Sequence, residues 1–306
     1  MHSLFVYTFY RFKKIKNINR YKNIFDEYLL KRDIKGTILI ANEGINGSLS
    51  GQKKSLEEFI KLMKSYLNIR KLELKINQTE FLPFNKMKVR LKKEIVSLGQ
   101  GHIDVNKFRG KLIEPEDWDH IISNKYTKII DVRNDFEIEI GKFKGSINPK
   151  TNKFREFPKV FKEMKIKKED TIAMYCTGGI RCEKASALLN KEGYKNIFQL
   201  RGGIINYLKL KNENKEKSKW VGECFVFDDR VSINKKLIKG QYLQCYGCRR
   251  PITKNDTKSI HYKKGVSCHY CIRERTIKQI QSSQTRQDQI NLAELRNVPN
   301  PFRKIY

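Results

Sequence analysis

Short apolar segments alternate with amphipathic helix patterns throughout residues 115–212, and this alternation limits the possible folds more than any other feature of the chain. The apolar segments are "KIIDVR", "TIAMYC" and "NIFQL". Strands that are separated by helices form a parallel sheet with helices on both faces. Reactive groups in such sheets lie at the carboxyl ends of the strands, which is where Asp131 and Cys176 occur.

Residues 1–98 show a different order of patterns, namely β-α-β-β-α-β. The expected strands are "SLFVYTFY", "TILIANEG", "INGSLSG" and "KMKVRLKKEIVSLG", and the expected helices are "YKNIFDEYLLKR" and "KSLEEFIKLMKSYL". This order is typical of a ferredoxin-like, or acylphosphatase-like, α+β sandwich. Residues 99–114 are mixed and contain glycine, which indicates a linker. The predicted fold class is therefore α/β, with this sandwich before the parallel-sheet domain at 115–212.

The segment "CTGGIRCEKAS" follows the strand that ends near Cys176 and begins the next helix. Gly178 and Gly179 permit backbone conformations that point successive N–H groups toward one centre. The positive end of the helix and Arg181 both stabilise a thiolate, which makes Cys176 a nucleophile. We therefore expect a loop that surrounds the sulfur with positive charge, and the alternative is a buried structural cysteine.

The position of the arginine indicates which anion this loop accepts. The spacing is C-x4-R, whereas tyrosine-phosphatase-like loops read C-x5-R, and Cys182 stands where their arginine would be. A tighter loop suits a persulfide or a small adduct better than a phosphate. Cys182 either packs in the first helical turn or acts as a resolving thiol.

All seven cysteines lie after residue 175, and four of them form two CxxC pairs that are separated by 19 residues within a cysteine-rich region at 213–275. This spacing is typical of a tetrahedral structural zinc site, and reduced thiols without metal are the alternative. Residues 276–306 are polar, so we expect a short helix and then a flexible tail. The four predicted zinc ligands are Cys245, Cys248, Cys268 and Cys271.

The net charge of +31, from 64 Lys and Arg against 33 Asp and Glu, favours a nucleic-acid partner, although an AT-rich genome would also enrich lysine. Basic and aromatic side chains around the cysteine pairs suit contacts with RNA, and a solvated surface with packed tyrosines is the alternative. No run reaches the ~18 apolar residues of a membrane span, so a cytoplasmic protein is expected. The RNA-contact candidates are Arg249, Arg250, Tyr262, Lys263 and Lys264.

Several of these segments together resemble one known family. "DVRNDFE", "CTGGIRCEKAS" and "LRGGI" are similar to the strand signature, active loop and closing turn of rhodanese domains. "GTILIANEGINGSLSG", "TNKFREFP" and "WVGECFVFDDRVSIN" extend the similarity over roughly residues 1–275. The chain as a whole resembles the rhodanese-type tRNA uridine hydroxylases, the TrhO family, which hydroxylate uridine 34.

This resemblance implies oxygen-dependent hydroxylation of the wobble uridine in the tRNA anticodon loop, which gives 5-hydroxyuridine. It places Cys176 at the active-site cysteine of the family, which forms a persulfide, and Asp131 and Arg133 at a supporting strand-end pair. We expect this pair to bond loop backbone and to contact Glu137 or Glu139. A persulfide-forming sulfurtransferase is the alternative function, and an RNA-binding or zinc scaffold is disfavoured because the loop is intact. No flavin, haem or nicotinamide motif is evident, so molecular oxygen is the expected co-substrate and the electron donor is not predicted.

Uracil chemistry gives a mechanistic hypothesis, because C5 becomes nucleophilic only after a group adds to C6. We expect Cys176, or its persulfide, to add to C6 while Arg181 and the loop amides stabilise the enolate. Oxygen would then react at C5.

Overall fold

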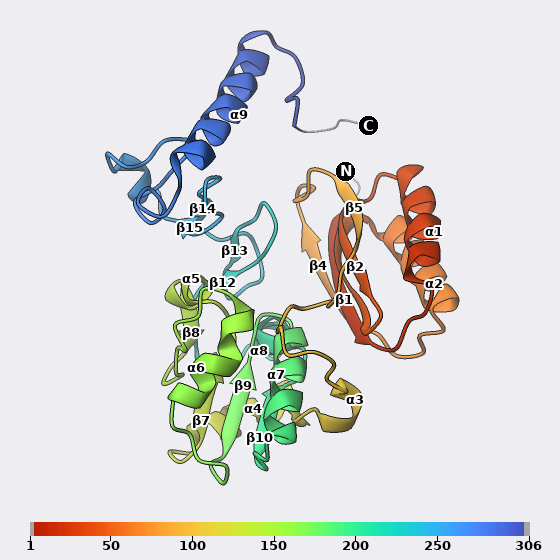
Figure 1. Cartoon of the computed structure of the whole chain (residues 1–306), viewed down its shortest axis with the longest axis vertical. Helices are drawn as coiled ribbons and strands as arrows, with labels where there is room; N and C mark the ends of the chain where they lie inside the picture. The colour runs from red at the N-terminus through yellow and green to blue at the C-terminus, as the bar shows by residue number, and fades with distance from the viewer. Residues whose placement is uncertain (1–2, 303–306) are drawn as a thin grey trace. The chain divides into compact units, whose positions relative to one another are not determined.

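The computed structural model describes residues 3–302, which divide into two compact units. The first unit extends to Cys224 and includes Asn234–Ile238. The second comprises Phe225–Ile233 and the chain from Lys239 onward. The first elements of unit 1 are β1 (Leu4–Phe12), α1 (Ile18–Leu30), β2 (Lys35–Ala41), β3 (Gly44–Gln52), α2 (Lys53–Tyr66), β4 (Glu73–Thr79) and β5 (Met87–Leu91) (Figure 1).

These elements form a sandwich of one sheet and two helices, which confirms the expected acylphosphatase-like fold. The strand order is β4-β1-β3-β2-β5, with β5 parallel to β2 and the other pairs antiparallel. The sequence predicts four strands, and β4 is not among them. Strand β4 has only two apolar residues, Leu74 and Ile76, and its buried positions are the polar residues Lys75 and Asn77, so its sequence shows no apolar face.

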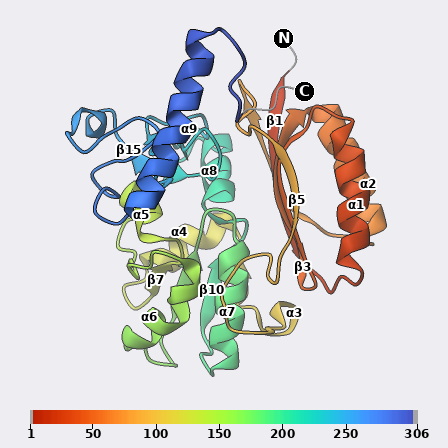
Figure 2. The ribbon, with the colours of Figure 1, turned by 45° about the horizontal axis from the view of Figure 1, so that its top comes forward.

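Both helices cover the same face of this sheet (Figure 2). Phe25 and Phe59 from the helices pack with Phe9 from β1, and all three are fully buried. Each such side chain contributes about 1.5–3 kcal/mol through its burial. Tyr10 and Phe12 project from the opposite face of β1 into a separate hydrophobic core, so this strand is buried on both sides.

That separate core belongs to the parallel-sheet domain, whose strand order is β6-β10-β9-β7. Ile172 and Met174 of β9 face this core, whereas Tyr175 packs against Trp118 and Phe143 on the other face. The elements are α3 (Val105–Phe108), β6 (Lys111–Ile113), α4 (Pro115–Ser123), β7 (Lys128–Asp131), α5 (Asp135–Glu139), β8 (Gly141–Phe143), η1 (Phe154–Glu156), α6 (Phe157–Glu163), β9 (Ile172–Tyr175), α7 (Ile180–Lys191), β10 (Ile197–Leu200), α8 (Gly203–Glu213) and β11 (Trp220–Gly222).

The segment 99–114, for which the sequence predicts a linker, is largely built into the fold. Its strand β6 pairs with β10, and Ile103 and Val105 are buried in the same core as Tyr10. The sequence of residues 99–114 does not indicate that they are part of the fold, because only a few of their side chains are buried and apolar.

The elements after β11 are short except for the last helix. They are β12 (Cys224–Phe225), β13 (Ser232–Ile233), β14 (Leu243–Gln244), β15 (Pro251–Ile252), η2 (Asp256–Lys258) and α9 (Ile277–Leu295). Helix α9 is 19 residues long, so the segment holds more helix than the short one that the sequence predicts. No helix in the described range 3–302 has the length and apolar character needed to cross a membrane.

Polar contacts hold the first half of α9 to the segment that precedes it. A capping box between Thr276 and Gln279 begins the helix. The Arg275 guanidinium donates a hydrogen bond to Ser283 Oγ at 2.7 Å, and Arg286 donates one to the Gly265 carbonyl at 2.8 Å. Anchoring by hydrogen bonds leaves no apolar pattern in the sequence, which is why the composition alone suggested a flexible tail.

Candidate active site

Strand β9 ends at Tyr175 and delivers Cys176 to a loop that leads into α7. The Gly179 N–H donates a hydrogen bond to Cys176 Sγ at 3.1 Å. Gly179 has a φ of 98°, which favours glycine, and a Cβ there would lie 3.0 Å from Tyr10 Oη. The backbone thus turns an N–H toward the sulfur, as the sequence predicts.

The start of α8 fixes the other side of this loop. The N–H groups of Ile204 and Ile205 donate to the carbonyls of Cys176 and Thr177 at 3.0 and 3.2 Å. Gly203 has a φ of 68°, and a Cβ there would lie 2.4 Å from the Cys176 carbonyl oxygen. The second glycine of "LRGGI" is therefore required for the close approach of the two segments.

The environment of Cys176 favours the thiolate. Burial alone would raise the pKa of the thiol, since only 1% of the residue is exposed. A hydrogen bond from the Cys182 side chain, the charge of Arg181 and the N–H groups of Cys182 and Gly179 outweigh burial and lower the pKa to about 5. The sulfur is therefore ionised at neutral pH.

The structure gives Cys182 a role as a hydrogen-bond donor, which is neither of the two roles, packing and resolving thiol, expected from the sequence. Its thiol lies against Cys176 and is fully buried, and this burial, together with the neighbouring thiolate, raises the pKa of Cys182 well above its usual range. Cys182 therefore stays protonated and donates to the sulfur of Cys176. A C-x5-C spacing is the sequence signal that places both side chains at the same loop.

The positive charge of Arg181 stabilises the Cys176 thiolate, and the carboxylate of Glu137 holds Arg181 in place. Its two terminal nitrogens bind the two oxygens of Glu137, each at 2.7 Å. Burial would raise the pKa of Glu137, but Arg181 outweighs it and the net shift is downward. The expected contact of Glu137 with Arg133 is limited to the Glu137 backbone carbonyl, because the Glu137 carboxylate pairs with Arg181.

Asp131 and Arg133 form a fully buried ion pair behind the loop. Arg133 Nη2 lies 2.6 Å from Asp131 Oδ2, and the same guanidinium donates to the Glu137 and Gly141 carbonyls. The pair ties the end of β7 to α5 and β8. It thereby positions Glu137, and through Glu137 it positions Arg181.

The sequence does not predict three side chains near the loop, namely Tyr10, Lys75 and Glu183. Tyr10 and Lys75 come from the N-terminal sandwich. Tyr10 on β1 donates a hydrogen bond to Glu183 Oε1 on α7 at 2.7 Å. Lys75 on β4 lies beside Gly178, since a Cβ on that glycine would be 3.9 Å from Lys75 Cε. Residues more than 100 positions before Cys176 carry no local signal of this proximity, and β4 itself was missed.

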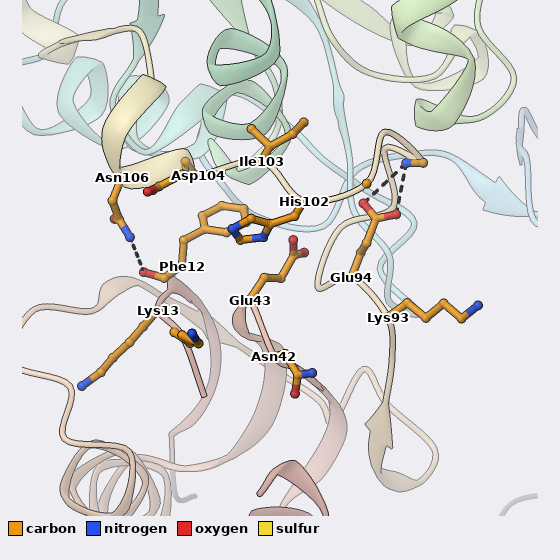
Figure 3. A pocket seen from close by; sticks show the side chains of 14 residues that line it. Phe12, Lys13, Asn42, Glu43, Lys93, Glu94, His102, Ile103, Asp104 and Asn106 are labelled. Carbon is orange, nitrogen blue, oxygen red and sulfur yellow. Dashed lines mark hydrogen bonds between the residues drawn. The ribbon is translucent and has the colours of Figure 1, made fainter. Parts of the chain in front are cut away.

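A second cluster joins α7 to the sandwich. Lys184, which is fully buried, binds Glu43 Oε2 at 2.8 Å and Glu94 Oε2 at 2.5 Å. Both carboxylates line a pocket of about 920 Å³, from which Lys93 extends outward (Figure 3). Cys176 is not among the residues that line this pocket. Lys184 therefore neutralises the acidic wall of the pocket and fixes the position of α7.

The four cysteines of unit 2 form one cluster, with their sulfurs all within 4.8 Å of one another. The separations Cys245–Cys271 and Cys248–Cys268 are both 3.9 Å, and Cys268–Cys271 is 3.8 Å. A tetrahedral zinc ion with bonds of about 2.3 Å requires sulfurs about 3.8 Å apart. The quartet therefore fits a zinc ion.

Comparison with known proteins identifies the family. The chain is 46% identical over 300 residues to the tRNA uridine(34) hydroxylase of Pelagibacter ubique (strain HTCC1062), and the match covers 98% of each chain. The chain belongs to the tRNA uridine(34) hydroxylase family. Residues 4–95 match the UPF0176 acylphosphatase like domain and residues 114–210 match the rhodanese-like domain. These matches confirm the predicted family and both predicted folds.

Two solved structures that resemble the rhodanese domain of this tRNA uridine(34) hydroxylase family member each match about a third of its length. A rhodanese-related protein of Thermoplasma volcanium is 27% identical and covers 33% of this chain and 92% of its own, with a TM-score of 0.28. A rhodanese-like domain protein of Staphylococcus aureus is 21% identical and covers 32% and 90%, with a TM-score of 0.28.

The predicted RNA contacts of this family member differ in their exposure. Arg249, Lys263 and Lys264 are exposed, whereas Arg250 pairs with Glu274 at 3.0 Å. Tyr262 is half-buried and packs against the four-cysteine cluster. Of the five predicted contacts, these three cations are therefore the ones with exposed side chains.

Proposed function

We propose that this chain hydroxylates C5 of the wobble uridine of tRNA and that Cys176 is the nucleophile. The observation that carries this proposal is the identity of 46%, over almost the whole of both chains, to a tRNA uridine(34) hydroxylase. The geometry supports it, because the loop presents a thiolate with a pKa of about 5 beside a hydrogen-bonded turn. The net charge of +31 favours a polyanionic substrate such as tRNA.

The chemistry needs an electron-rich C5, which a sulfur nucleophile can create. The Cys176 thiolate, or its persulfide, forms a bond to C6, and the C5=C6 π electrons move to the enolate oxygen O4. Oxygen and a proton then give a hydroperoxide at C5. A thiol reductant supplies two electrons, which convert the hydroperoxide to a hydroxyl and water. Loss of the C5 proton and expulsion of sulfur restore the double bond.

The proposal is tested with purified protein, an unmodified tRNA transcript, a thiol reductant and ¹⁸O-labelled oxygen. Mass analysis of the nucleosides should show 5-hydroxyuridine that carries one ¹⁸O atom, and Cys176→Ser should form none. Product in the absence of oxygen, or product whose oxygen comes from water, would contradict the mechanism. Unchanged product with Cys176→Ser would remove the thiol from it.

Sulfur transfer is a second candidate function, because a buried thiolate next to the Gly179 amide also suits a persulfide. The same reactions, repeated with a sulfane-sulfur donor, distinguish the two functions. A thiouridine product would support sulfur transfer, whereas 5-hydroxyuridine supports hydroxylation.

Zinc bound by the four cysteines would serve a structural purpose. Four thiolates complete a tetrahedral site and leave no position for a substrate. The bound ion would hold Cys245 and Cys248 against Cys268 and Cys271, and so shape unit 2 around Tyr262.

Exposed cations of unit 2 would contact the tRNA backbone. Reversing two charges with Lys263→Glu and Lys264→Glu should weaken tRNA binding and reduce its dependence on salt. The exposed pair Lys235 and Lys236 offers a matched control with the same change in charge. Filter binding at two salt concentrations measures both effects. If the two double variants weaken binding equally, binding depends on overall charge and not on Lys263 and Lys264 in particular.

A further inference from the structure

Strand β4 brings one buried lysine to the rhodanese loop. Lys75 pairs in register with Thr8 of β1 and is only 8% exposed. Its Nζ lies 5.2 Å from the centre of the Tyr10 ring, and its Cε lies next to Gly178. The side chain of Lys75 therefore extends over the loop that carries Cys176.

The ammonium group of Lys75 has no polar partner in the described part of the chain. Within residues 3–302, its Nζ makes no hydrogen bond to protein and no ion pair. Burial lowers its pKa, while Glu73, Cys176 and Glu183 act in the opposite direction without cancelling the shift. Buried charges in proteins are normally paired, so an unpaired one beside a nucleophile indicates a functional site.

The nearby carboxylates are occupied by other groups. Glu183 accepts the hydrogen bond of Tyr10 and lies 3.8 Å from Arg109. Glu73 lies 3.9 Å from Arg201. Lys75 is therefore a cation next to the loop that can bind a ligand. Its flexible side chain allows Nζ to move from the Tyr10 ring toward a base.

We propose that Lys75 is a catalytic residue of the N-terminal sandwich, whose Nζ donates a hydrogen bond to the uracil carbonyl oxygen that becomes negative when Cys176 adds to C6. This inference rests on the proposed function. In this step the S–C6 bond forms, the C5=C6 π electrons move to O4, and Lys75 donates a hydrogen bond without losing its proton. When sulfur leaves, the electrons return and the hydrogen bond weakens.

The expected size of the effect follows from other oxyanion donors, whose removal lowers kcat by about 10²–10³. Lys75→Met should therefore lower kcat for 5-hydroxyuridine formation by about 100-fold with little change in KM. Lys75→Arg keeps a donor and should restore part of the rate. Lys88→Met, on the exposed edge strand β5 of the same sheet, is the matched control and should retain the rate of the unaltered protein.

Alkylation of Cys176 with iodoacetamide, followed by peptide mass analysis, shows whether the loop remains intact in each variant. Loss of the nearby positive charge should move the midpoint of the alkylation rate to higher pH in Lys75→Met but not in Lys88→Met. A kcat in Lys75→Met equal to that of the control, or a loss that arginine does not restore, would overturn the role of Lys75. If the unaltered protein forms no 5-hydroxyuridine, the proposed function itself fails, which is a separate result.

Discussion

At the scale of single residues, the reactivity of Cys176 results from opposing contributions. Burial disfavours its thiolate, and short contacts with Cys182, Arg181 and the loop amides favour it more strongly. At pH 7 a group with a pKa of about 5 is about 99% ionised, compared with a few per cent for an ordinary thiol. The loop therefore keeps the proposed nucleophile ionised without a separate general base.

The Cys182 thiol can be tested as a donor by two substitutions of similar size. The alkylation rate of Cys176 should rise with pH around a midpoint near 5 in the unaltered protein. Cys182→Ala removes the donor, so the midpoint should move to higher pH, whereas Cys182→Ser retains a hydroxyl donor and should stay closer to the original. Identical midpoints in the alanine and serine variants would show that Cys182 only fills space.

The residues of the loop were predictable to different degrees. Cys176 and Arg181 follow from a strand, a glycine turn and a helix that are contiguous in the sequence. The pairing of Arg181 with Glu137 requires the fold, because several carboxylates lie in the same short segment. Lys75 could not be predicted at all, since its proximity depends on the packing of one domain against another.

At the scale of elements, helix α7 carries both residues of the Cys176 loop and residues that bind the N-terminal sandwich. Its first turn carries Arg181, Cys182 and Glu183, and Lys184 begins the second turn. Glu183 and Lys184 contact the N-terminal sandwich. The helix is buried on most of its surface, so its sequence shows no clear amphipathic pattern. Its existence was nevertheless predictable from its place between a glycine turn and the next strand.

Lys184→Met should destabilise unit 1, because it leaves Glu43 and Glu94 without their buried cation. Breaking a buried pair costs about 3–5 kcal/mol, and the partial exposure of both carboxylates reduces this to about 2–3 kcal/mol. Urea unfolding measures the change. Lys191→Met, an exposed position at the end of the same helix, serves as the control and should alter stability by less than about 0.5 kcal/mol. Similar values for both variants would refute a docking role for Lys184.

At the scale of the whole molecule, the chain combines two units that are stabilised by different means. Unit 1 contains the large hydrophobic cores, whereas the core of unit 2 centres on the four cysteines. The cysteine spacing made the quartet predictable. The long polar helix α9 was not, because hydrogen bonds from Arg275 and Arg286 replace the apolar face that sequence patterns detect.

Cys268→Ser should remove the zinc that we propose and should unfold unit 2 selectively. Metal analysis should give about one zinc per unaltered chain and much less for the variant. Limited proteolysis should then cleave the chain after residue 239 while unit 1 stays resistant. Cys182→Ser, which removes a thiol outside the quartet, should keep the metal. Full zinc content in Cys268→Ser would exclude the quartet as the site.

Strand β1 contributes Phe9 to one core and Tyr10 to the other, so neither core is complete without it. A rhodanese fragment that begins at residue 114 would lose the cover provided by Tyr10 and Phe12 and would expose an apolar surface to water. We therefore expect such a fragment to aggregate, whereas the whole chain keeps this core covered. Because both cores share β1, we expect the sandwich and the rhodanese domain to unfold as one cooperative unit.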